Sequence, residues 1–389
     1  IFDGTGNPSF KGDIGIKGGI IVKIGDITEK GNRTIDAKGL VVSPGFIDMH
    51  NHADHAILAF PNAECYIMQG VTTSLVGNCG LSMAPINSDN FELTKRYLFP
   101  FLRADFDYKW DWRTSKEYFE KVRKNNTAIN LAYLIGQGTL RIAVKGFEMT
   151  RASKEEMEKM KTILKQELEE GAFGLSTGLV YPPGSYSTTE ELIELTSVLK
   201  DYGALYATHM RSESDKLLES VEEAIKIGGE NGISVEISHH KAIGKANWGK
   251  VKDSLKMMEN ARQRGVAVNC DVYPYTAAMT TVSSLLPPWT LEGGVEKMLE
   301  CLKNQEERLK IEKDITEGNM KGENWIKEIG WENIMVAECP LDKDAEGKSL
   351  ETLFKEKNQF HQPFFPVIDF FVTSEGEATM DAPLTLPDL

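Results

Sequence analysis

The middle of the chain alternates between strand-like and helix-like segments at a nearly constant spacing, and this repeat limits the folds that the chain can adopt. Strand patterns begin near residues 172, 204, 233 and 266, so successive strands start 29 to 33 residues apart. A helix is expected in each interval, and one of them opens with the capping-box pair Thr188 and Glu191. Strands and helices that alternate in this way predict βαβ units and a parallel sheet.

Three further strand patterns precede these four and bring the expected total to seven. They read GLVVSPGFIDMH, TTSLVGNC and AINLAYLIG. A helix over residues 153–171, capped by Ser153 and Glu156, leads into the later four. Because polar residues follow at least four strands, we predict a (β/α)8 barrel of the TIM type, which carries its active site at the carboxyl ends of its strands. The alternative is an open doubly wound sheet, which offers a single crevice.

The eighth strand of this barrel has two candidate positions. One is the segment NIMVAEC, which ends at Cys339, and the other lies beyond Leu389. Residues 290–330 are charged and helical, and we expect them to be a surface insertion.

Residues 1–44 form a separate unit in this interpretation, and residues 45–389 form the barrel. The first unit is rich in glycine and β-branched residues and is expected to form short strands joined by turns. A few strands do not fold alone, so these should pair with strands from elsewhere in the protein. We also expect a few residues to be missing before Ile1 and a longer piece, including the last barrel strand, after Leu389.

The charge and the cysteine content exclude several classes of protein. The 389 residues include 44 basic and 58 acidic side chains, which gives a net charge of −14. This acidity argues against nucleic acid or an anionic membrane surface as a partner, and no segment has the roughly 18 consecutive apolar residues of a membrane span. Five scattered cysteines argue against a disulfide framework and for a reducing, cytoplasmic compartment.

Residue types that bind metals gather at the ends of the predicted strands. Five of the seven histidines stand there: His50, His52, His209, His239 and His240. His50 and His52 are two residues apart, so on a strand they would face the same side and could hold one cation. His239 continues the inward parity of its strand, whereas His240 points to the other side and is the alternative ligand.

Cys79 ends another of these strands. Gly77 and Gly80 flank it and allow the backbone to approach closely. A lone buried cysteine is usually an inert apolar residue, but this one stands at the same end of its strand as the histidines. We therefore count it among the candidate ligands.

Six motifs, in order along the chain, resemble a known family. They are PGFIDMHNH, QGVTTSLVGNCG, FGLSTGLVYPPG, ATHMRSE, ISHHKAIGKANWG and DVYPYTA. Together they resemble the N-acyl-D-amino-acid deacylases (D-aminoacylases), which belong to the amidohydrolase superfamily of metal-dependent hydrolases. The resemblance covers nearly the whole chain. It implies a (β/α)8 barrel joined to a small β-sandwich made from both chain ends, which would account for the strands before residue 45.

The resemblance also implies the metal ligands. By motif, one tightly bound zinc falls to Cys79, His209 and His239, and a second, weaker metal position falls to His50 and His52. A thiolate with two imidazoles suits zinc better than magnesium or calcium. The related hydantoinases and dihydroorotases use a carboxylated lysine at the end of the fourth strand. Here that strand, FGLSTGLVY, contains no lysine, which favours the deacylase branch.

The general base is not identified among the 389 residues. The family places an aspartate at the end of the eighth strand, in an S-D-G context. The segment FFVTSEGEATM resembles the part of the family that precedes this strand, so we expect the catalytic aspartate beyond Leu389. Glu375 is the first substitute, followed by Asp342 and Asp381.

Four residues are candidates for substrate binding. Lys241 shares the face of His239 and could meet a substrate carboxylate, unless it is an ordinary surface lysine. Tyr181 and Tyr273 match pocket positions of the family and could donate phenolic hydrogen bonds, or could pack in the core. Arg211 could pair with Glu213 or clamp a carboxylate.

The activity implied is the zinc-dependent hydrolysis of the amide bond of N-acyl-D-amino acids, which releases a carboxylate and a D-amino acid. Two alternatives stay open. One is a cyclic-amide hydrolase of the hydantoinase or dihydroorotase type. The other is a catalytically incomplete fragment that binds zinc without turning substrate over.

Overall fold

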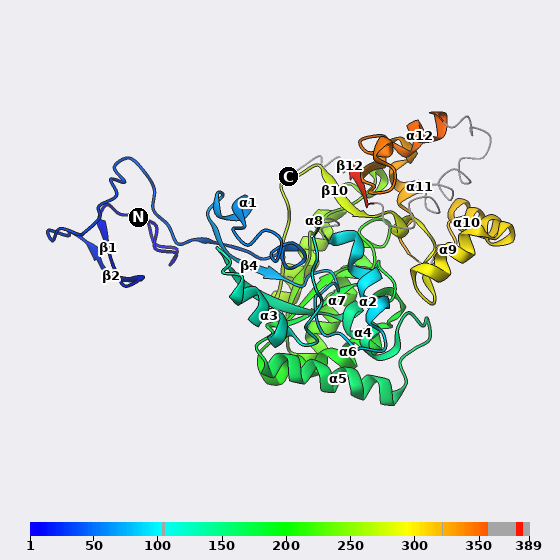
Figure 1. The fold of residues 1–389 in the computed structure, drawn as a ribbon, viewed down its shortest axis with the longest axis horizontal. Helices are drawn as coiled ribbons and strands as arrows, with labels where there is room; N and C mark the ends of the chain where they lie inside the picture. Colours follow the sequence, from blue (N-terminus) through cyan, green and yellow to red (C-terminus); the bar gives the residue numbers. More distant parts are fainter. Residues whose placement is uncertain (103–105, 321, 357–378, 384–389) are drawn as a thin grey trace.

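Seven parallel strands in chain order form the central sheet of the protein (Figure 1). The computed structural model describes residues 1–102, 106–320 and 322–356, and the backbone of residues 379–383. The strands are Phe46–Asp48 (β3), Val71–Val76 (β4), Asn130–Gly136 (β5), Gly174–Gly178 (β6), Leu205–His209 (β7), Ser234–Ile237 (β8) and Val268–Cys270 (β9). Each strand pairs in parallel with the one before it. All seven expected strands are confirmed.

The sheet is curled, so that its first and last strands approach each other. Residue His50, just after β3, lies 3.3 Å from the carboxylate of Asp271, just after β9. These two residues follow opposite edges of the sheet, and a flat sheet of seven strands would hold them far apart because neighbouring strands are about 4.8 Å apart. The carboxyl ends of the strands therefore converge on one region.

Helices connect the strands, as the repeat predicts. They are Glu64–Ile67 (α1), Phe91–Leu98 (α2), Ser115–Lys124 (α3), Gln137–Lys145 (α4), Lys154–Glu169 (α5), Thr189–Thr196 (α6), Leu217–Asn231 (α7) and Lys250–Gln263 (α8). Both predicted capping boxes are present, at Ser153 with Glu156 and at Thr188 with Glu191. In each box the side-chain oxygen accepts the third backbone N–H of the helix, and the glutamate accepts the N–H of the cap residue.

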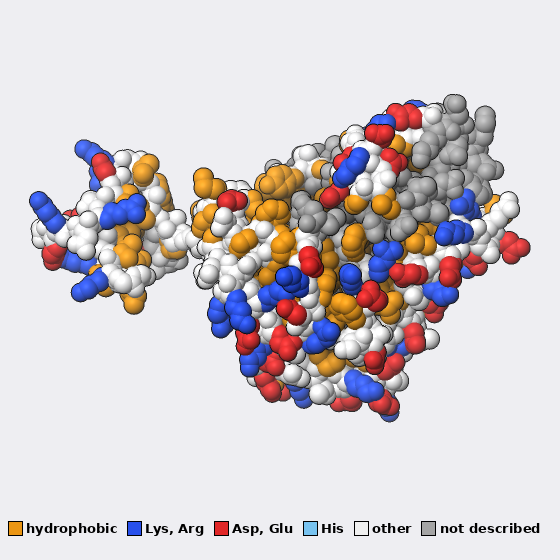
Figure 2. All heavy atoms as spheres, viewed as in Figure 1, with side chains coloured by type: hydrophobic (Ala, Val, Ile, Leu, Met, Phe, Trp, Pro, Cys, Tyr) orange, Lys and Arg blue, Asp and Glu red, His pale blue; other side chains and the backbone are white. Residues whose placement is uncertain are grey.

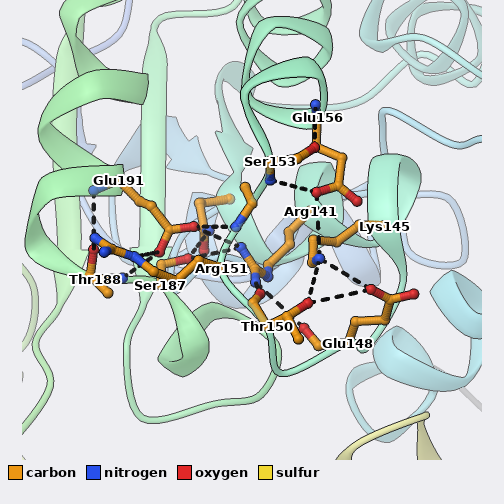
Figure 3. Close-up of polar contacts among 12 residues, drawn as sticks. Arg141, Lys145, Glu148, Thr150, Arg151, Ser153, Glu156, Ser187, Thr188 and Glu191 are labelled. Carbon is orange, nitrogen blue, oxygen red and sulfur yellow. Dashed lines mark hydrogen bonds and ion pairs between the residues drawn. The ribbon is translucent and has the colours of Figure 1, made fainter.

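Two buried basic side chains of α4 contact the two capping boxes, Arg141 at Glu191 and Lys145 at Glu156 (Figure 3). Arg141, on α4, is 1% exposed, and its guanidinium donates to the carbonyl of Thr150 at 2.7 Å. It also lies 3.7 Å from the carboxylate of Glu191, the capping glutamate of α6. Arg151 pairs with the same carboxylate at 3.9 Å, but 65% of its side chain is exposed. The network therefore fixes the start of α5 and of α6 against α4.

We expect the substitution Arg141→Ala to lower the free energy of unfolding by about 2 kcal/mol, because it removes a donor from a buried carbonyl and the buried cation beside the Glu191 carboxylate. The matched substitution Arg151→Ala should cost less than about 1 kcal/mol, because an exposed ion pair contributes little. Urea denaturation of the two variants measures both values. Equal losses of stability in the two variants would contradict the conclusion that burial makes the contacts of Arg141 the stronger ones.

The chain after β9 forms a second, smaller unit with its own apolar core. Three antiparallel strands lie in the order β10-β12-β11, with bounds Ala277–Thr281, Thr379–Pro383 and Met335–Glu338. The helices here are Val295–Lys303 (α9), Gln305–Thr316 (α10), Trp325–Ile329 (α11) and Leu350–Glu356 (α12). Buried residues such as Met298, Ile311 and Val336 pack together within this unit. The charged helices of residues 290–330 thus have a packed inner face.

The segment NIMVAEC does not provide an eighth barrel strand, so this prediction is wrong. It contains β11, which pairs with β12 in antiparallel orientation. A four-residue strand in that orientation belongs to a local antiparallel sheet and cannot continue the parallel order. The second candidate position, beyond Leu389, lies outside the described residues.

The N-terminal segment is a hairpin that lies apart from the barrel (Figure 1). Strands Asp13–Lys17 (β1) and Ile20–Gly25 (β2) pair with each other, and within the described residues neither pairs with another strand. The expected strand in TIDAKGLVV is not present. Apolar side chains of the hairpin face the solvent (Figure 2), including Ile16 at 67% and Val22 at 61% exposed.

The described part of the chain contains no candidate for a membrane-spanning helix. None of its helices is both long enough and apolar enough to cross a bilayer.

Candidate metal centre

A thiol and several imidazoles meet at the carboxyl ends of four strands. Cys79 follows β4, and its Sγ lies 3.4 Å from Nε2 of His50 and 3.6 Å from Nε2 of His239. His50 follows β3, and His239 follows β8. His209 is the last residue of β7, and its ring centroid is 4.4 Å from that of His239. The structure therefore brings four of the five predicted ligands into one cluster.

The spacing of these atoms fits a tetrahedral zinc ion. With Zn–S near 2.3 Å and Zn–N near 2.0–2.1 Å, tetrahedral geometry separates a sulfur and a nitrogen ligand by about 3.5 Å. The two separations between Cys79 Sγ and the imidazole nitrogens bracket this value. Both ring nitrogens of His209 are buried without a hydrogen-bond partner in the part of the chain that the structure describes. Buried polar atoms without partners call for a ligand such as an ion, so the residues present fit the metal.

The backbone is strained at two of these positions. Cys79 has φ of 56° and His239 has φ of 37°, in the left-handed region that side-chain-bearing residues rarely adopt. Close packing enforces the turn at Cys79, because a Cβ at Gly178 would lie 2.1 Å from the Cys79 carbonyl oxygen. Such strain persists where the surrounding structure holds a functional side chain in place.

Burial keeps most of the imidazoles neutral. It holds the pKa of His209 well below its usual range, and the neighbouring His239 adds to this effect. Burial and the ammonium of Lys241 likewise hold the pKa of His239 well below its usual range. Metal ions bind neutral imidazole, so both side chains are in the form that a metal requires.

His50 differs because Cys79 and the carboxylate of Asp271 lie next to its ring. Burial lowers its pKa, but Cys79 and the carboxylate of Asp271 outweigh that effect and raise the pKa to about 10. Asp271 also accepts the backbone N–H of His239 at 2.6 Å. A metal binds the neutral imidazole, so this raised pKa opposes metal binding at His50.

His52 lies beside this cluster. The prediction that His50 and His52 share one face of a strand is wrong, because β3 ends at Asp48 and both histidines lie beyond it. Their ring centroids are 5.7 Å apart at 78°. His52 groups instead with Asp54 and His55, and the ligand atoms of these three lie within 4.8 Å of one another.

His240 points away from the cluster as predicted, but not through strand alternation, because β8 ends at Ile237. Its Nε2 contacts the hydroxyl of Ser254, on α8, at 2.8 Å.

Lys241 is buried, and its ammonium lies 2.6 Å from the carboxylate of Glu213. It is therefore not a surface lysine. Arg211 pairs with Glu223 on α7 at 3.0 Å, so the alternative that it pairs with Glu213 is wrong. Arg211 also donates to the carbonyls of Ser185 and Ser187, so it holds the loop after β6 against α7.

The two predicted tyrosines lie near the cluster. Tyr181 presents its ring edge to His209 at 4.9 Å between centroids, and its hydroxyl contacts Thr280 at 2.9 Å. The hydroxyl of Tyr273 is buried and has no hydrogen-bond partner among the described residues. The ammonium of Lys241 lies 5.5 Å from the centre of the Tyr273 ring. Tyr273 and Lys241 thus offer an unused donor and a cation close together.

A mostly apolar pocket adjoins the cluster. Leu81 and Tyr181 line it next to the ligands, and Phe101, which stacks against His52 at 6.1 Å, forms another wall. The remaining lining residues are Arg96, Tyr97, Pro100, Phe147, Pro182, Thr281, Ser283, Ser284, Leu291, Val295 and Met298. Arg96 is paired with Glu296 at 3.0 Å.

Sequence reasoning missed Asp271, which contacts two of the candidate ligands. Its position at the end of β9, as the first residue of the motif DVYPYTA, satisfies the same strand-end criterion that selected the histidines. Asp54 and His55 were missed too, although both directly follow the H-x-H pair.

Of the proposed general bases, the structure describes Asp342 in full and Asp381 by its backbone. The aspartate expected beyond Leu389 and its substitute Glu375 are outside the described residues. Asp342 lies in the turn after β11, in the smaller unit. Asp381 lies in β12, which the structure describes by its backbone alone.

Comparison with known proteins agrees with this centre. The sequence profile of the Amidohydrolase family matches residues 33–311. The chain belongs to this family. It is 37% identical over 281 residues to the D-aminoacylase of Alcaligenes xylosoxydans xylosoxydans, and this alignment covers 72% of this chain and 57% of the relative. It is also 37% identical over 282 residues to the N-acyl-D-aspartate deacylase of the same organism, which covers 72% and 55%. The chain thus spans a little over half the length of these curated relatives.

The similarity to a solved structure covers nearly the whole length of this amidohydrolase. The N-acyl-D-glutamate deacylase of Bordetella bronchiseptica, in complex with zinc and a phosphonate inhibitor, superposes with a TM-score of 0.77 at 27% identity. The match covers 98% of this chain and 69% of that one. The predicted barrel class is confirmed.

Proposed function

We propose that this protein is a zinc-dependent hydrolase that cleaves the amide bond of N-acyl-D-amino acids. The observation that carries the proposal is the meeting of the Cys79 thiol with His50, His209 and His239 at the strand ends of an amidohydrolase. Relatives of this chain named for the hydrolysis of N-acyl-D-amino acids support the substrate class.

The tight zinc is proposed to be held by Cys79, His209 and His239, and a second, weaker metal by His50 and His52. When bound, zinc polarises the substrate carbonyl and lowers the pKa of a water molecule to about 7. Asp271 supports this arrangement, because its carboxylate holds both the ring of His50 and the backbone of His239.

The substrate carboxylate is proposed to lie between Lys241 and Tyr273. The Tyr273 hydroxyl is an unpartnered buried donor, and the Lys241 ammonium is the nearby cation. Tyr181 forms the wall between His209 and the apolar pocket, which receives the amino-acid side chain. Arg211 contributes through the loop of residues 185–187 that it holds.

The division into residues 1–44 and residues 45–389 is proposed as well. The hairpin of β1 and β2 supports it, because these strands pair with each other and lie apart from the parallel sheet (Figure 1). A cytoplasmic enzyme acting on a small molecule agrees with the acidic charge and the free cysteines.

An assay with linear and with cyclic amide substrates distinguishes the proposed activity from its alternatives. We expect the zinc-loaded protein to hydrolyse N-acetyl-D-methionine and to leave dihydroorotate and a substituted hydantoin unchanged. The strand β6 supplies no lysine, which supports this expectation. Release of the free amino acid is measured by liquid chromatography. Turnover of the cyclic amides alone would contradict the proposal, and zinc binding without any turnover would favour the incomplete fragment.

The apolar pocket predicts the class of side chain. We expect kcat/KM for N-acetyl-D-methionine to exceed that for N-acetyl-D-glutamate by at least about tenfold, because a carboxylate in this pocket would meet apolar walls and an arginine already paired with Glu296. N-acetyl-D-glutamine is the control for size without charge and should fall between the two. A preference for the glutamate derivative would contradict this assignment of the pocket.

A further inference from the structure

A buried carboxylate links the metal cluster to Lys241. Glu213 lies in the loop between β7 and α7 and is 2% exposed. Its Oε1 lies 2.8 Å from Nδ1 of His239, and the ammonium of Lys241 lies 2.6 Å from its Oε2 and 2.7 Å from its Oε1. One carboxylate therefore contacts both a proposed zinc ligand and the proposed anchor for the substrate carboxylate.

These contacts fix the tautomer of His239. A carboxylate accepts hydrogen bonds. Nδ1 of His239 therefore donates its N–H to Glu213, which leaves the lone pair on Nε2. The Lys241 ammonium lies 3.1 Å from the same nitrogen and donates to Glu213 and to the His239 carbonyl. Nε2 of His239 faces Sγ of Cys79 at 3.6 Å. A carboxylate that binds the far nitrogen of a metal-binding histidine fixes the ring and raises its basicity.

Glu213 is itself held by a residue from the smaller unit. Its backbone N–H donates to the carboxylate of Glu323 at 2.6 Å. Glu323 lies 110 residues further along the chain, between α10 and α11, and is 4% exposed. Glu323 thus brings a second carboxylate to Glu213 in a buried place. Burial of a charged side chain costs free energy. Packing alone therefore does not explain a glutamate at position 323.

We propose that Glu323 is a positioning residue for the metal centre. Its carboxylate fixes the backbone of Glu213, and Glu213 in turn holds the ring of His239 and the ammonium of Lys241. The unit that follows β9 thereby contributes to both metal affinity and substrate affinity without touching either ligand. The part that concerns substrate rests on the proposed function, whereas the part that concerns the metal does not.

Three substitutions at one position test this role. Glu323→Ala removes the acceptor, Glu323→Asp withdraws it by one methylene group, and Glu323→Gln keeps an oxygen that can accept the N–H of Glu213. Glu317→Ala is the matched control, because Glu317 is an exposed glutamate at the end of α10 in the same unit. Circular dichroism identifies the variants that fold, and the comparison uses those.

Zinc affinity is measured by competition with a chelator, and geometry by the thiolate-to-metal absorption of the cobalt-loaded protein. We expect Glu323→Ala to weaken zinc binding by about tenfold or more, as for the loss of other groups that orient metal ligands. The cobalt spectrum should change as well. Glu323→Asp should show a smaller loss, and Glu323→Gln and Glu317→Ala should resemble the parent protein.

Steady-state kinetics with N-acetyl-D-methionine tests the proposed effect of Glu323 on substrate binding. We expect Glu323→Ala to raise KM more than it lowers kcat, because Lys241 loses its orientation. Unchanged zinc affinity and KM in a folded Glu323→Ala protein would overturn the proposal, and so would a Glu323→Gln protein as defective as Glu323→Ala. Absence of turnover in the parent protein would refute the proposed function, while the zinc and cobalt measurements would still decide the role of Glu323.

Discussion

Replacement of Cys79 by alanine is expected to abolish tight zinc binding and to lower kcat/KM by at least about 1,000-fold. A metal that polarises the carbonyl contributes several kcal/mol to catalysis, and each 1.4 kcal/mol is tenfold in rate. The substitution removes the sulfur that lies within 3.6 Å of two imidazoles, and it leaves a gap that a neutral methyl group cannot bridge.

The zinc content of the dialysed variant and its rate with N-acetyl-D-methionine measure this effect. Cys65→Ala is the control, because Cys65 is an exposed cysteine on α1. It should keep both zinc and activity. Zinc retained at the parent level in Cys79→Ala would contradict the ligand assignment.

Discrimination between enantiomers is expected to be the other large effect. The N-acetyl derivative of D-methionine should react at least about 100-fold faster than that of L-methionine. In the proposed arrangement, the metal centre would fix the acyl carbonyl, Lys241 and Tyr273 would fix the carboxylate, and the apolar pocket would receive the side chain. Inversion of the α-carbon either drives the side chain into the wall or separates the carboxylate from its cation, and an unpaired buried charge costs several kcal/mol.

The ratio of kcat/KM for the two enantiomers tests this directly. Lys241→Ala should raise KM for the D-form and reduce the ratio, because one of the three points of attachment is lost. Equal rates for both enantiomers in the parent protein would remove the proposed substrate class and would favour a cyclic-amide hydrolase.

Much of the barrel could be predicted from the sequence, because the patterns that indicate its strands and helices involve residues close together in the chain. Strand and helix periodicity, together with the capping boxes at Ser153 and Thr188, depends on residues a few positions apart. The same holds for the ends of strands, and this is why Cys79, His209 and His239 could be selected together. His240 lies on the side of α8 as predicted, although β8 ends at Ile237 and strand alternation does not extend to it.

Pairings between loops could not be predicted in this way. Whether Arg211 meets Glu213 or Glu223 depends on the path of the loop after β7, and both glutamates lie within reach in the sequence. The contact of Glu213 with Glu323 joins residues 110 positions apart, and no local pattern encodes it. His52 was misplaced for a simpler reason, because β3 stops at Asp48 and strand alternation no longer applies beyond that point.

The closeness of His50 to Asp271 has a consequence for folding. These residues are 221 positions apart, and they follow the first and the last strand of the parallel sheet. Contacts of such long range form slowly, since the intervening chain must be ordered first. Zinc held as proposed by Cys79, His209 and His239 would join the ends of β4, β7 and β8 in the same region. Its binding energy would add to the stability of the sheet, so zinc is expected to protect β4, β7 and β8 together from hydrogen exchange.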